Sequence, residues 1–270
     1  MTKSDMNREL RMRVNNISIN FGGLKAVSSF SCELYKGELI GLIGPNGAGK
    51  TTVFNMLSGV YTPTEGEIEF RDHHGNTHLS HKLSPAKLNS IGLARTFQNI
   101  RLFQNMSVKD NILIALHASR AHNPVDALFR LKKFRLDEKR MNDRTDELLS
   151  LFKIEKKKEE LASNLPYGEQ RKLEIARALA SRPCLLLLDE PAAGMNPQET
   201  EELMNLISFI RNEFNLTIIL IEHDMRLVMG ICERLVVLDY GQAIAAGTPD
   251  EIKRNTAVIK AYLGTEAVDG

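Results

Sequence analysis

Residues 44–51 read Gly-Pro-Asn-Gly-Ala-Gly-Lys-Thr, and this spacing can hold the phosphates of a nucleotide. The run fills the phosphate-loop template, in which a glycine and four further residues precede Gly-Lys-Thr. Glycines allow the backbone N–H groups to turn inward, and a helix that starts behind them adds partial positive charge. Within such a loop Lys50 can reach the β- and γ-phosphates, and the hydroxyl of Thr51 can bind Mg²⁺. The chain is therefore expected to bind a nucleoside triphosphate.

The segments on either side of this loop support that interpretation. Residues 39–43 form a short apolar run suited to a buried strand, and residues 52–57 suit the start of a helix. A glycine-rich turn before a helix is the alternative, and the order of strand, glycine loop and helix argues against it. The expected nucleotide-binding residues of this segment are Gly44, Pro45, Asn46, Gly47, Ala48, Gly49, Lys50, Thr51 and Thr52.

Two carboxylates, Asp189 and Glu190, complete an apolar run that starts at residue 185. In an open α/β sheet, ligands bind beyond the carboxyl ends of the strands. Asp189 is therefore placed to hold Mg²⁺ through water, and Glu190 to polarise an attacking water molecule. The alternative is a strand that simply ends in charged residues. His223 follows the next apolar strand and can contact the γ-phosphate from the same edge, although a lone histidine is more often structural or solvated.

The elements that must position these residues alternate in the second half of the chain. A helix is predicted over 168–181, and strands over 184–188 and 217–221. Asn196 and Thr248 each begin a helix-capping pattern, and the second is expected to open a final helix that runs towards Leu263. Alternating strands and helices predict a largely parallel sheet.

The first half of the chain has a different pattern. Strands are predicted within 12–43 and 61–71, and residues 107–162 read as mostly helical. Residues 72–90 contain four histidines and are expected to form a solvated loop. A metal site is the alternative there, but no carboxylate or cysteine pattern accompanies the histidines.

Composition sets limits on the class of protein. The 270 residues suit one large domain, or a core with a sub-domain, and 43% of them are hydrophobic. A formal net charge of +1 gives no indication of a nucleic-acid surface. The three cysteines are far apart, which predicts neither a disulfide framework nor a metal site, and Cys184 is expected to be buried. No apolar stretch is long enough to span a bilayer and no signal peptide is recognised, so a soluble chain is expected.

Taken in order, these motifs resemble the ATP-binding cassette family. Phe21 resembles the aromatic residue that stacks on adenine, and Gln98 resembles the glutamine that ligates Mg²⁺ and senses the membrane partner. Residues 165–170 stand in the position of the signature motif, residues 193–196 resemble the D-loop, and His223 resembles the switch histidine. The signature residues that the resemblance assigns to nucleotide binding are Tyr167, Gly168 and Glu169.

The resemblance implies an α/β fold of the P-loop NTPase class. It implies a mixed, mostly parallel core sheet, an N-terminal antiparallel β subdomain and an inserted α-helical subdomain. The ATP-binding cassette domain is expected over 12–246, with the helical subdomain at about 96–170, and a C-terminal helical extension over 247–264.

Within the family, the sequence of these motifs is similar to that of the ATP-binding subunits of bacterial branched-chain amino acid importers. Matching phrases include residues 95–103, residues 189–197 and the tail Ala-Tyr-Leu-Gly at 261–264. The resemblance implies an ATPase that uses ATP and Mg²⁺ at the cytoplasmic face of a membrane. Its implied partners are transmembrane permease subunits, a second ATP-binding subunit in a homo- or heterodimer and, indirectly, a substrate-binding protein, with no nucleic acid.

One departure from the family pattern concerns the signature, which usually reads Leu-Ser-Gly-Gly-Gln. Pro166 stands at the serine position and offers neither a hydroxyl nor an N–H donor, although proline is well tolerated in the first turn of a helix. The helix start with Gly168 can still present positive potential to a phosphate.

Several alternatives stay open at this point. The lipopolysaccharide-export ATPase shares much of the tail, and a soluble cassette ATPase could act on ribosomes or DNA. A phosphate-loop kinase or GTPase is a third possibility, although the chain has no Asn-Lys-x-Asp base-reading motif. A regulatory subunit with a decayed site is the last, and Lys50, Asp189, Glu190 and His223 argue against it.

Overall fold

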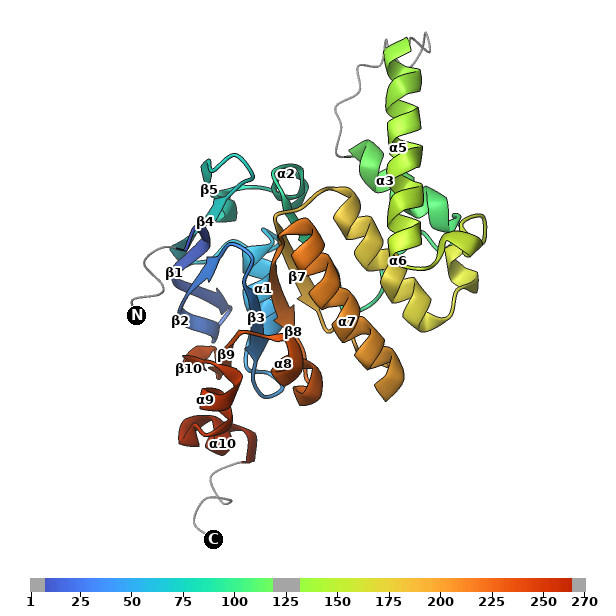
Figure 1. The fold of residues 1–270 in the computed structure, drawn as a ribbon. Helices are drawn as coiled ribbons and strands as arrows, with labels where there is room; N and C mark the ends of the chain where they lie inside the picture. Colours follow the sequence, from blue (N-terminus) through green and yellow to red (C-terminus); the bar gives the residue numbers. More distant parts are fainter. Residues whose placement is uncertain (1–7, 119–131, 264–270) are drawn as a thin grey trace. The chain divides into compact units, whose positions relative to one another are not determined.

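The computed structural model describes residues 8–118 and 132–263, which form two compact units (Figure 1). The core unit comprises the chain up to Arg95 and from Cys184 onward. The helical unit comprises Thr96–Pro183. Within the described ranges, every helix is too short or too polar to cross a membrane.

A six-stranded sheet runs through the described part of the core unit in the order β10-β9-β3-β8-β7-β6. Its neighbouring strands are parallel except for the edge pair β9 and β10. Strands β3, β7 and β8 are buried along their whole length, as expected for apolar runs in a parallel sheet. The strands are β3 (Leu39–Ile43), β6 (Leu93–Arg95), β7 (Leu185–Asp189), β8 (Thr217–Ile221), β9 (Arg234–Asp239) and β10 (Gln242–Gly247). The prediction of a largely parallel sheet is confirmed.

An antiparallel sheet with the order β2-β1-β4-β5 completes the described strands of this unit. Its strands are β1 (Leu10–Phe21), β2 (Leu24–Tyr35), β4 (Glu65–Arg71) and β5 (Thr77–Leu79). Ile17 and Ile19 of β1 are buried, and so is Ser18 between them. The strands predicted within 12–43 and 61–71 are confirmed as β1, β2, β3 and β4. The described helices of the unit are α1 (Lys50–Leu57), α2 (Pro85–Ser90), α7 (Pro197–Phe214), α8 (Met225–Ile231), α9 (Pro249–Lys253) and α10 (Thr256–Leu263).

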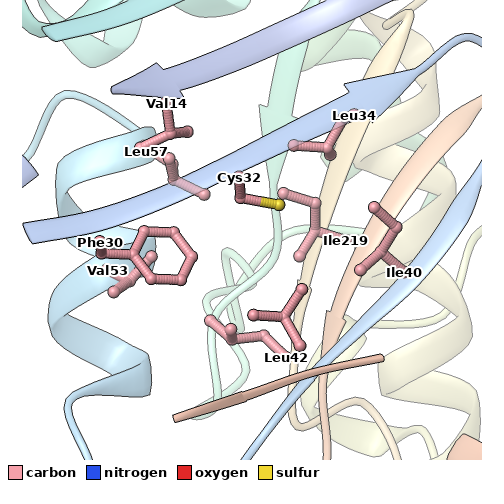
Figure 2. A pocket seen from close by; sticks show the side chains of 10 residues that line it. Val14, Phe30, Cys32, Leu34, Ile40, Leu42, Val53, Leu57 and Ile219 are labelled. Atoms are coloured by element: carbon pink, nitrogen blue, oxygen red, sulfur yellow. The ribbon is translucent and has the colours of Figure 1, made fainter. Parts of the chain in front are cut away.

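Helix α1 shares one apolar core with both sheets (Figure 2). Val53 and Leu57 of α1 point towards Phe30 of β2 and towards Leu42 and Ile219 of the parallel sheet, around a cavity of about 20 Å³. Only apolar side chains and the Cys32 thiol line this cavity, so it is expected to stay dry. Because α1 is packed on several sides, the loop at its amino end is fixed as well.

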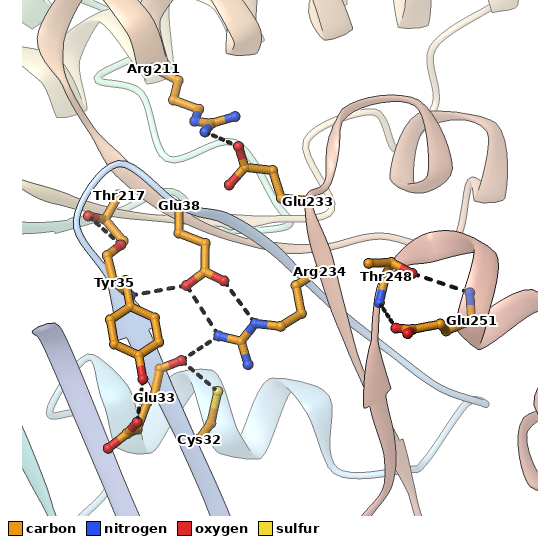
Figure 3. A network of polar contacts seen from close by, with 10 residues as sticks. All are labelled: Cys32, Glu33, Tyr35, Glu38, Arg211, Thr217, Glu233, Arg234, Thr248 and Glu251. Atoms are coloured by element: carbon orange, nitrogen blue, oxygen red, sulfur yellow. Dashed lines mark hydrogen bonds and ion pairs between the residues drawn. The ribbon is translucent and has the colours of Figure 1, made fainter. Parts of the chain in front are cut away.

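A polar network joins the amino ends of strands β3 and β9, at the edge of the sheet away from the phosphate loop (Figure 3). Glu38, only 4% exposed, accepts from Arg234 Nε at 2.8 Å and from a second guanidinium nitrogen at 3.2 Å. The amide of Tyr35 also donates to this carboxylate, at 3.0 Å. The buried carboxylate of Glu38 is therefore paired with an arginine and a backbone amide.

The helical unit contains α3 (Val108–Ala118), α5 (Lys132–Leu151) and α6 (Tyr167–Ala180), with two short 3₁₀ turns between α5 and α6. Its described helices pack on one another through residues such as Ile112, Leu148 and Leu173, all fully buried. The helix predicted over 168–181 is confirmed as α6. The mostly helical character predicted for 107–162 is confirmed in the described part, while residues 119–131 lie outside it.

Two local predictions are wrong. Residues 72–90 form β5, a 3₁₀ turn and α2, because their polar side chains satisfy backbone and carboxylate groups: His81 Nδ1 accepts from the Ile68 amide at 3.1 Å, and His78 Nε2 lies 2.9 Å from Asp72 Oδ2. The alternative was a metal site. Within the described residues, no group of three or more His, Cys, Asp or Glu side chains is arranged so that it could hold an ion.

The second correction concerns the expected final helix, which is two helices rather than one. The capping box of Thr248 and Glu251 starts α9, as predicted. The chain then breaks at Asn255, whose side chain accepts from the Ala257 and Val258 amides and so starts α10. The capping box predicted at Asn196 is confirmed at the start of α7.

Candidate functional site

The phosphate loop connects β3 to α1, and close packing requires glycine at two of its positions. A Cβ on Gly44 would lie 2.0 Å from the Leu238 carbonyl oxygen, and one on Gly49 would lie 2.9 Å from that of Ala26. Both glycines have positive φ, which side-chain-bearing residues rarely adopt. Among the described residues, no side chain caps the start of α1. The first-turn amides of α1 are therefore available to an anion.

Lys50 is folded back over its own loop. Its Nζ donates to the carbonyl oxygens of Gly44 at 2.7 Å and Pro45 at 2.8 Å, and the residue is 5% exposed. Burial lowers the pKa of Lys50, and the Glu190 carboxylate acts in the opposite direction. A phosphate oxygen can take over the hydrogen bonds from Lys50 Nζ that the two carbonyls now accept.

Asp189 lies at the end of β7 and is held by an arginine from the neighbouring strand β6. Arg95 Nη2 lies 2.8 Å from Asp189 Oδ2, and both side chains are almost fully buried. Arg95 Nη1 donates to Asn55 Oδ1 at 2.8 Å and Ser58 Oγ at 2.7 Å. One guanidinium therefore ties this carboxylate to helix α1. Sequence reasoning missed the role of Arg95, although its place one residue before Thr-Phe-Gln at a strand end was visible.

Glu190 and His223 meet at this edge of the parallel sheet. His223 Nε2 lies 2.8 Å from Glu190 Oε1, so the structure brings together two residues that the sequence placed there separately. Glu190 has φ of 46°, an unusual conformation for a residue with a side chain and one that is common at functional sites. Its amide donates to the Ile221 carbonyl at 2.9 Å, which holds this conformation against β8.

Glu222 is a positioning residue that sequence reasoning did not identify. It is 4% exposed, and its two carboxylate oxygens accept from the Ala192 amide at 2.6 Å and the His223 amide at 3.0 Å. Burial raises the pKa of Glu222, and these amide hydrogen bonds oppose the rise. Glu222 thus fixes the turn after Glu190 relative to His223. Its signal was a carboxylate at the end of an apolar strand, the same pattern that identified Asp189.

Phe21 ends β1 and is 44% exposed. Its ring packs edge-on against Tyr61, with 5.3 Å between the ring centroids. An exposed aromatic face that a second ring holds in place can accept a flat base by stacking. Tyr61 is a second candidate in this position that the sequence did not suggest.

Within the helical unit, a buried arginine of α6 holds the segment that carries Gln98. Arg171, fully buried, donates to the backbone oxygens of Phe97 and Gln98, each at 2.8 Å, and pairs with Glu174 at 2.7 Å. Glu174 in turn accepts from the Arg101 amide at 3.2 Å. The helix that follows the signature motif therefore fixes the backbone on which Gln98 is mounted.

The signature segment begins α6, with Pro166 at the N-cap rather than inside the first turn. The Pro166 carbonyl accepts from the Glu169 and Gln170 amides, each at 3.0 Å, as a helix start requires. Tyr167 is 44% exposed, and Gly168 follows it on the first turn. The Glu169 carboxylate is paired with Lys157 Nζ at 2.6 Å, so part of its charge is already balanced within the helical unit.

The donor set suits Mg²⁺. A hydroxyl at Thr51, a carboxylate at Asp189 and an amide oxygen at Gln98 are hard oxygen ligands, which Mg²⁺ prefers. Magnesium usually binds one or two protein groups and completes its shell with phosphate oxygens and water. Thr51 and Asp189 both belong to the core unit, while Gln98 belongs to the helical unit.

Comparison with known proteins agrees with the motifs. The sequence pattern of the ABC transporter family matches residues 27–193, and that of the branched-chain amino acid ATP-binding cassette transporters matches residues 244–268. The high-affinity branched-chain amino acid transport ATP-binding protein LivG of Escherichia coli K12 is 47% identical over 94% of this chain and 97% of its own length. The lipopolysaccharide export system ATP-binding protein LptB of the same strain is 31% identical over 94% of this chain and 98% of its own.

Among solved structures, the ADP conformation of an ATP-binding cassette of an ABC transporter superposes with a TM-score of 0.78 at 28% identity. The match covers 94% of this chain and 99% of that one. The predicted α/β nucleotide-binding fold is therefore confirmed.

Proposed function

The chain belongs to the ABC transporter family of ATP-binding cassette ATPases, and from that premise we propose that it powers a membrane importer for branched-chain amino acids. Support for this cargo comes from the higher identity to the branched-chain amino acid relative than to the lipopolysaccharide one. The C-terminal match at residues 244–268 points in the same direction. ATP is the substrate, and the observation that carries the hydrolytic role is the Glu190–His223 pair.

Each candidate site residue of the core unit has a role in this proposal. Lys50 and the first-turn amides of α1 bind the phosphates, and Phe21 stacks on the base. Glu190 accepts a proton from the attacking water, and His223 orients that carboxylate and contacts the γ-phosphate. Thr51 and Asp189 would hold Mg²⁺, which would supply positive charge to the phosphate oxygens.

The remaining nucleotide contacts come from a second ATP-binding subunit. The start of α6, with Tyr167, Gly168 and Glu169, faces the nucleotide of that subunit, so ATP joins the two chains and hydrolysis separates them. Gln98 of the helical unit would offer a further oxygen ligand to Mg²⁺ and would sense the nucleotide on behalf of the transmembrane permease subunits. The chain thereby acts at the cytoplasmic face of a membrane, and a separate substrate-binding protein delivers the amino acid to the permease.

Replacing Glu190 by glutamine tests the catalytic assignment. Glu190→Gln keeps the size of the side chain but removes its basicity, so turnover should fall by a factor of about 100 or more while nucleotide binding persists. Phosphate release by the chain assembled with its permease measures turnover, and a fluorescent ATP analogue measures binding. Glu201→Gln is the control, because Glu201 is exposed on α7 and should leave turnover unchanged. Full activity of Glu190→Gln would exclude Glu190 as the base.

Cargo requires a separate experiment on the assembled transporter. Liposomes that contain the permease subunits and this chain, supplied with the substrate-binding protein, should accumulate labelled leucine only with ATP. The same assembly should not extract lipopolysaccharide. Release of lipopolysaccharide without leucine uptake would support the rival transport system and remove the proposed cargo.

A further inference from the structure

The signature segment carries a carboxylate on the helix turn that is proposed to receive a phosphate. Glu169 lies in the first turn of α6, at the last signature position, where the family usually has glutamine. Its amide donates to the Pro166 carbonyl at 3.0 Å, so the residue is part of the helix start. The partial positive charge of a helix N-terminus favours phosphate, but a carboxylate on the same turn opposes binding because the two anions repel each other. The charge of Glu169 therefore needs a partner if α6 is to bind a triphosphate.

Lys157 supplies that partner from outside the helix. Its Nζ donates to Glu169 Oε2 at 2.6 Å and to Oε1 at 2.9 Å, so one ammonium group binds both carboxylate oxygens. The two side chains are 34% and 28% exposed, which leaves the pair only partly screened by solvent. Arg171, two positions further along α6, is fully buried and pairs with Glu174 instead.

The backbone that carries Lys157 is fixed within the helical unit. Lys157 ends a 3₁₀ turn over Glu155–Lys157, and its amide donates to the Ile154 carbonyl at 3.1 Å. Ile154 is 2% exposed, which anchors the turn in the apolar interior. The carbonyl of Glu160 then accepts from the Val108 amide of α3 at 2.9 Å. Packing and backbone hydrogen bonds therefore hold the segment that presents the ammonium group.

Stability alone does not account for this pair. Partly exposed ion pairs contribute little to folding, because solvent screens them and ordering two long side chains costs entropy. The next lysine, Lys158, forms a pair of that ordinary kind, with a single contact of 3.5 Å to Asp146. The pair between Lys157 and Glu169 differs because both carboxylate oxygens are bound and because it lies at the start of α6. Its effect is expected on what this helix start binds.

We propose that Lys157 is a positioning residue for the signature segment, which neutralises and holds Glu169 so that the start of α6 can accept the triphosphate of the second ATP-binding subunit. The inference rests on the proposed function, in which this helix start faces the nucleotide of that subunit. It assigns part of the nucleotide affinity to a lysine that lies outside every motif.

Lys157→Met in the full-length chain removes the charge and keeps most of the apolar stem. At low ionic strength, KM for ATP in the ATPase assembled with its permease should rise about two- to fivefold, the change expected from one partly exposed charge interaction. The value of kcat should change less, because Lys157 touches no reacting atom. The rise should shrink at about 0.5 M salt, since salt screens the repulsion between Glu169 and the phosphates.

Three further variants identify the charge as the cause. Lys157→Arg keeps the cation and should retain the wild-type KM. The double variant Lys157→Met/Glu169→Gln should also return KM to the wild-type range, because no unpaired carboxylate is then left at the helix start. Lys158→Met is the matched control: it removes the same charge one position away, from a pair with 42% and 56% exposure, and should leave KM unchanged.

The outcomes separate this inference from the function on which it rests. If the wild-type assembly hydrolyses ATP and Lys157→Met has the same KM, the role of Lys157 is wrong and the proposed function stands. A rise in KM that persists in the double variant, or that appears equally in Lys158→Met, would also overturn the role, since the effect would then not act through Glu169. If the wild-type assembly hydrolyses no ATP, the proposed function fails and the inference fails with it.

Discussion

Arg95→Met is expected to lower the free energy of unfolding by about 3–5 kcal/mol, the usual cost of removing one partner from a buried ion pair. The Arg95 and Asp189 side chains are only 7% and 4% exposed, so water cannot replace the lost guanidinium at Asp189. Asn55 and Ser58 lose a donor in the same step. Methionine keeps the length and apolar stem of the side chain, so little of the loss should come from packing.

Urea-induced unfolding followed by circular dichroism measures the effect. Arg13→Met is the matched control, because Arg13 pairs with Glu33 at the surface and its removal should cost about 1 kcal/mol or less. The double variant Arg95→Met/Asp189→Asn should recover a large part of the loss, since no buried charge is then left unpaired. A loss in Arg95→Met no larger than in Arg13→Met, or additive effects in the double variant, would refute this reasoning.

Three further predictions follow from single contacts. Lys50→Ala removes a charged phosphate donor, so the Kd for ATP, measured by calorimetry, should rise by a factor of about 10 to 100; an unchanged Kd would contradict this role. Pro166→Ser restores a hydroxyl at the start of α6 and should raise phosphate release in the assembled complex by about two- to tenfold; equal turnover would make the missing hydroxyl irrelevant. Burial pushes the pKa of Asp72 upward, but hydrogen bonds from His78 and Asn76 outweigh it and hold the pKa below its usual range. The ionised Asp72 carboxylate therefore stabilises the folded state. This contribution is complete above about pH 4 and is lost as the pH falls further, so Asp72→Asn should flatten the acid dependence of Tm, measured by calorimetry.

The sequence predicted the elements around the phosphate loop because their signals are local. The glycine spacing at 44–49 follows from backbone conformation, and the capping boxes at Asn196 and Thr248 involve residues three positions apart. Continuous apolar runs predicted the buried strands β7 and β8. Local reasoning failed at 72–90 and at Asn255, where polar side chains form turns, caps and a short strand instead of the expected loop and unbroken helix.

The candidate site likewise has features that the sequence predicts and features that only the folded structure shows. The sequence by itself determined the residue types that can bind phosphate and activate water: Lys50, Asp189, Glu190 and His223. It also placed the last three at strand ends, because a parallel sheet brings its carboxyl ends to one edge.

Only the tertiary structure decided which groups hold those residues in place. Arg95 meets Asp189 from 94 positions away, and Arg171 donates to the Phe97 carbonyl from 74 positions away. Neither contact leaves a periodic or spacing signal, because sheet order and helix packing create it rather than neighbouring residues. Short motifs therefore supply the reactive side chains, whereas the orientation of those side chains depends on long-range hydrogen bonds that exist only once the chain is folded.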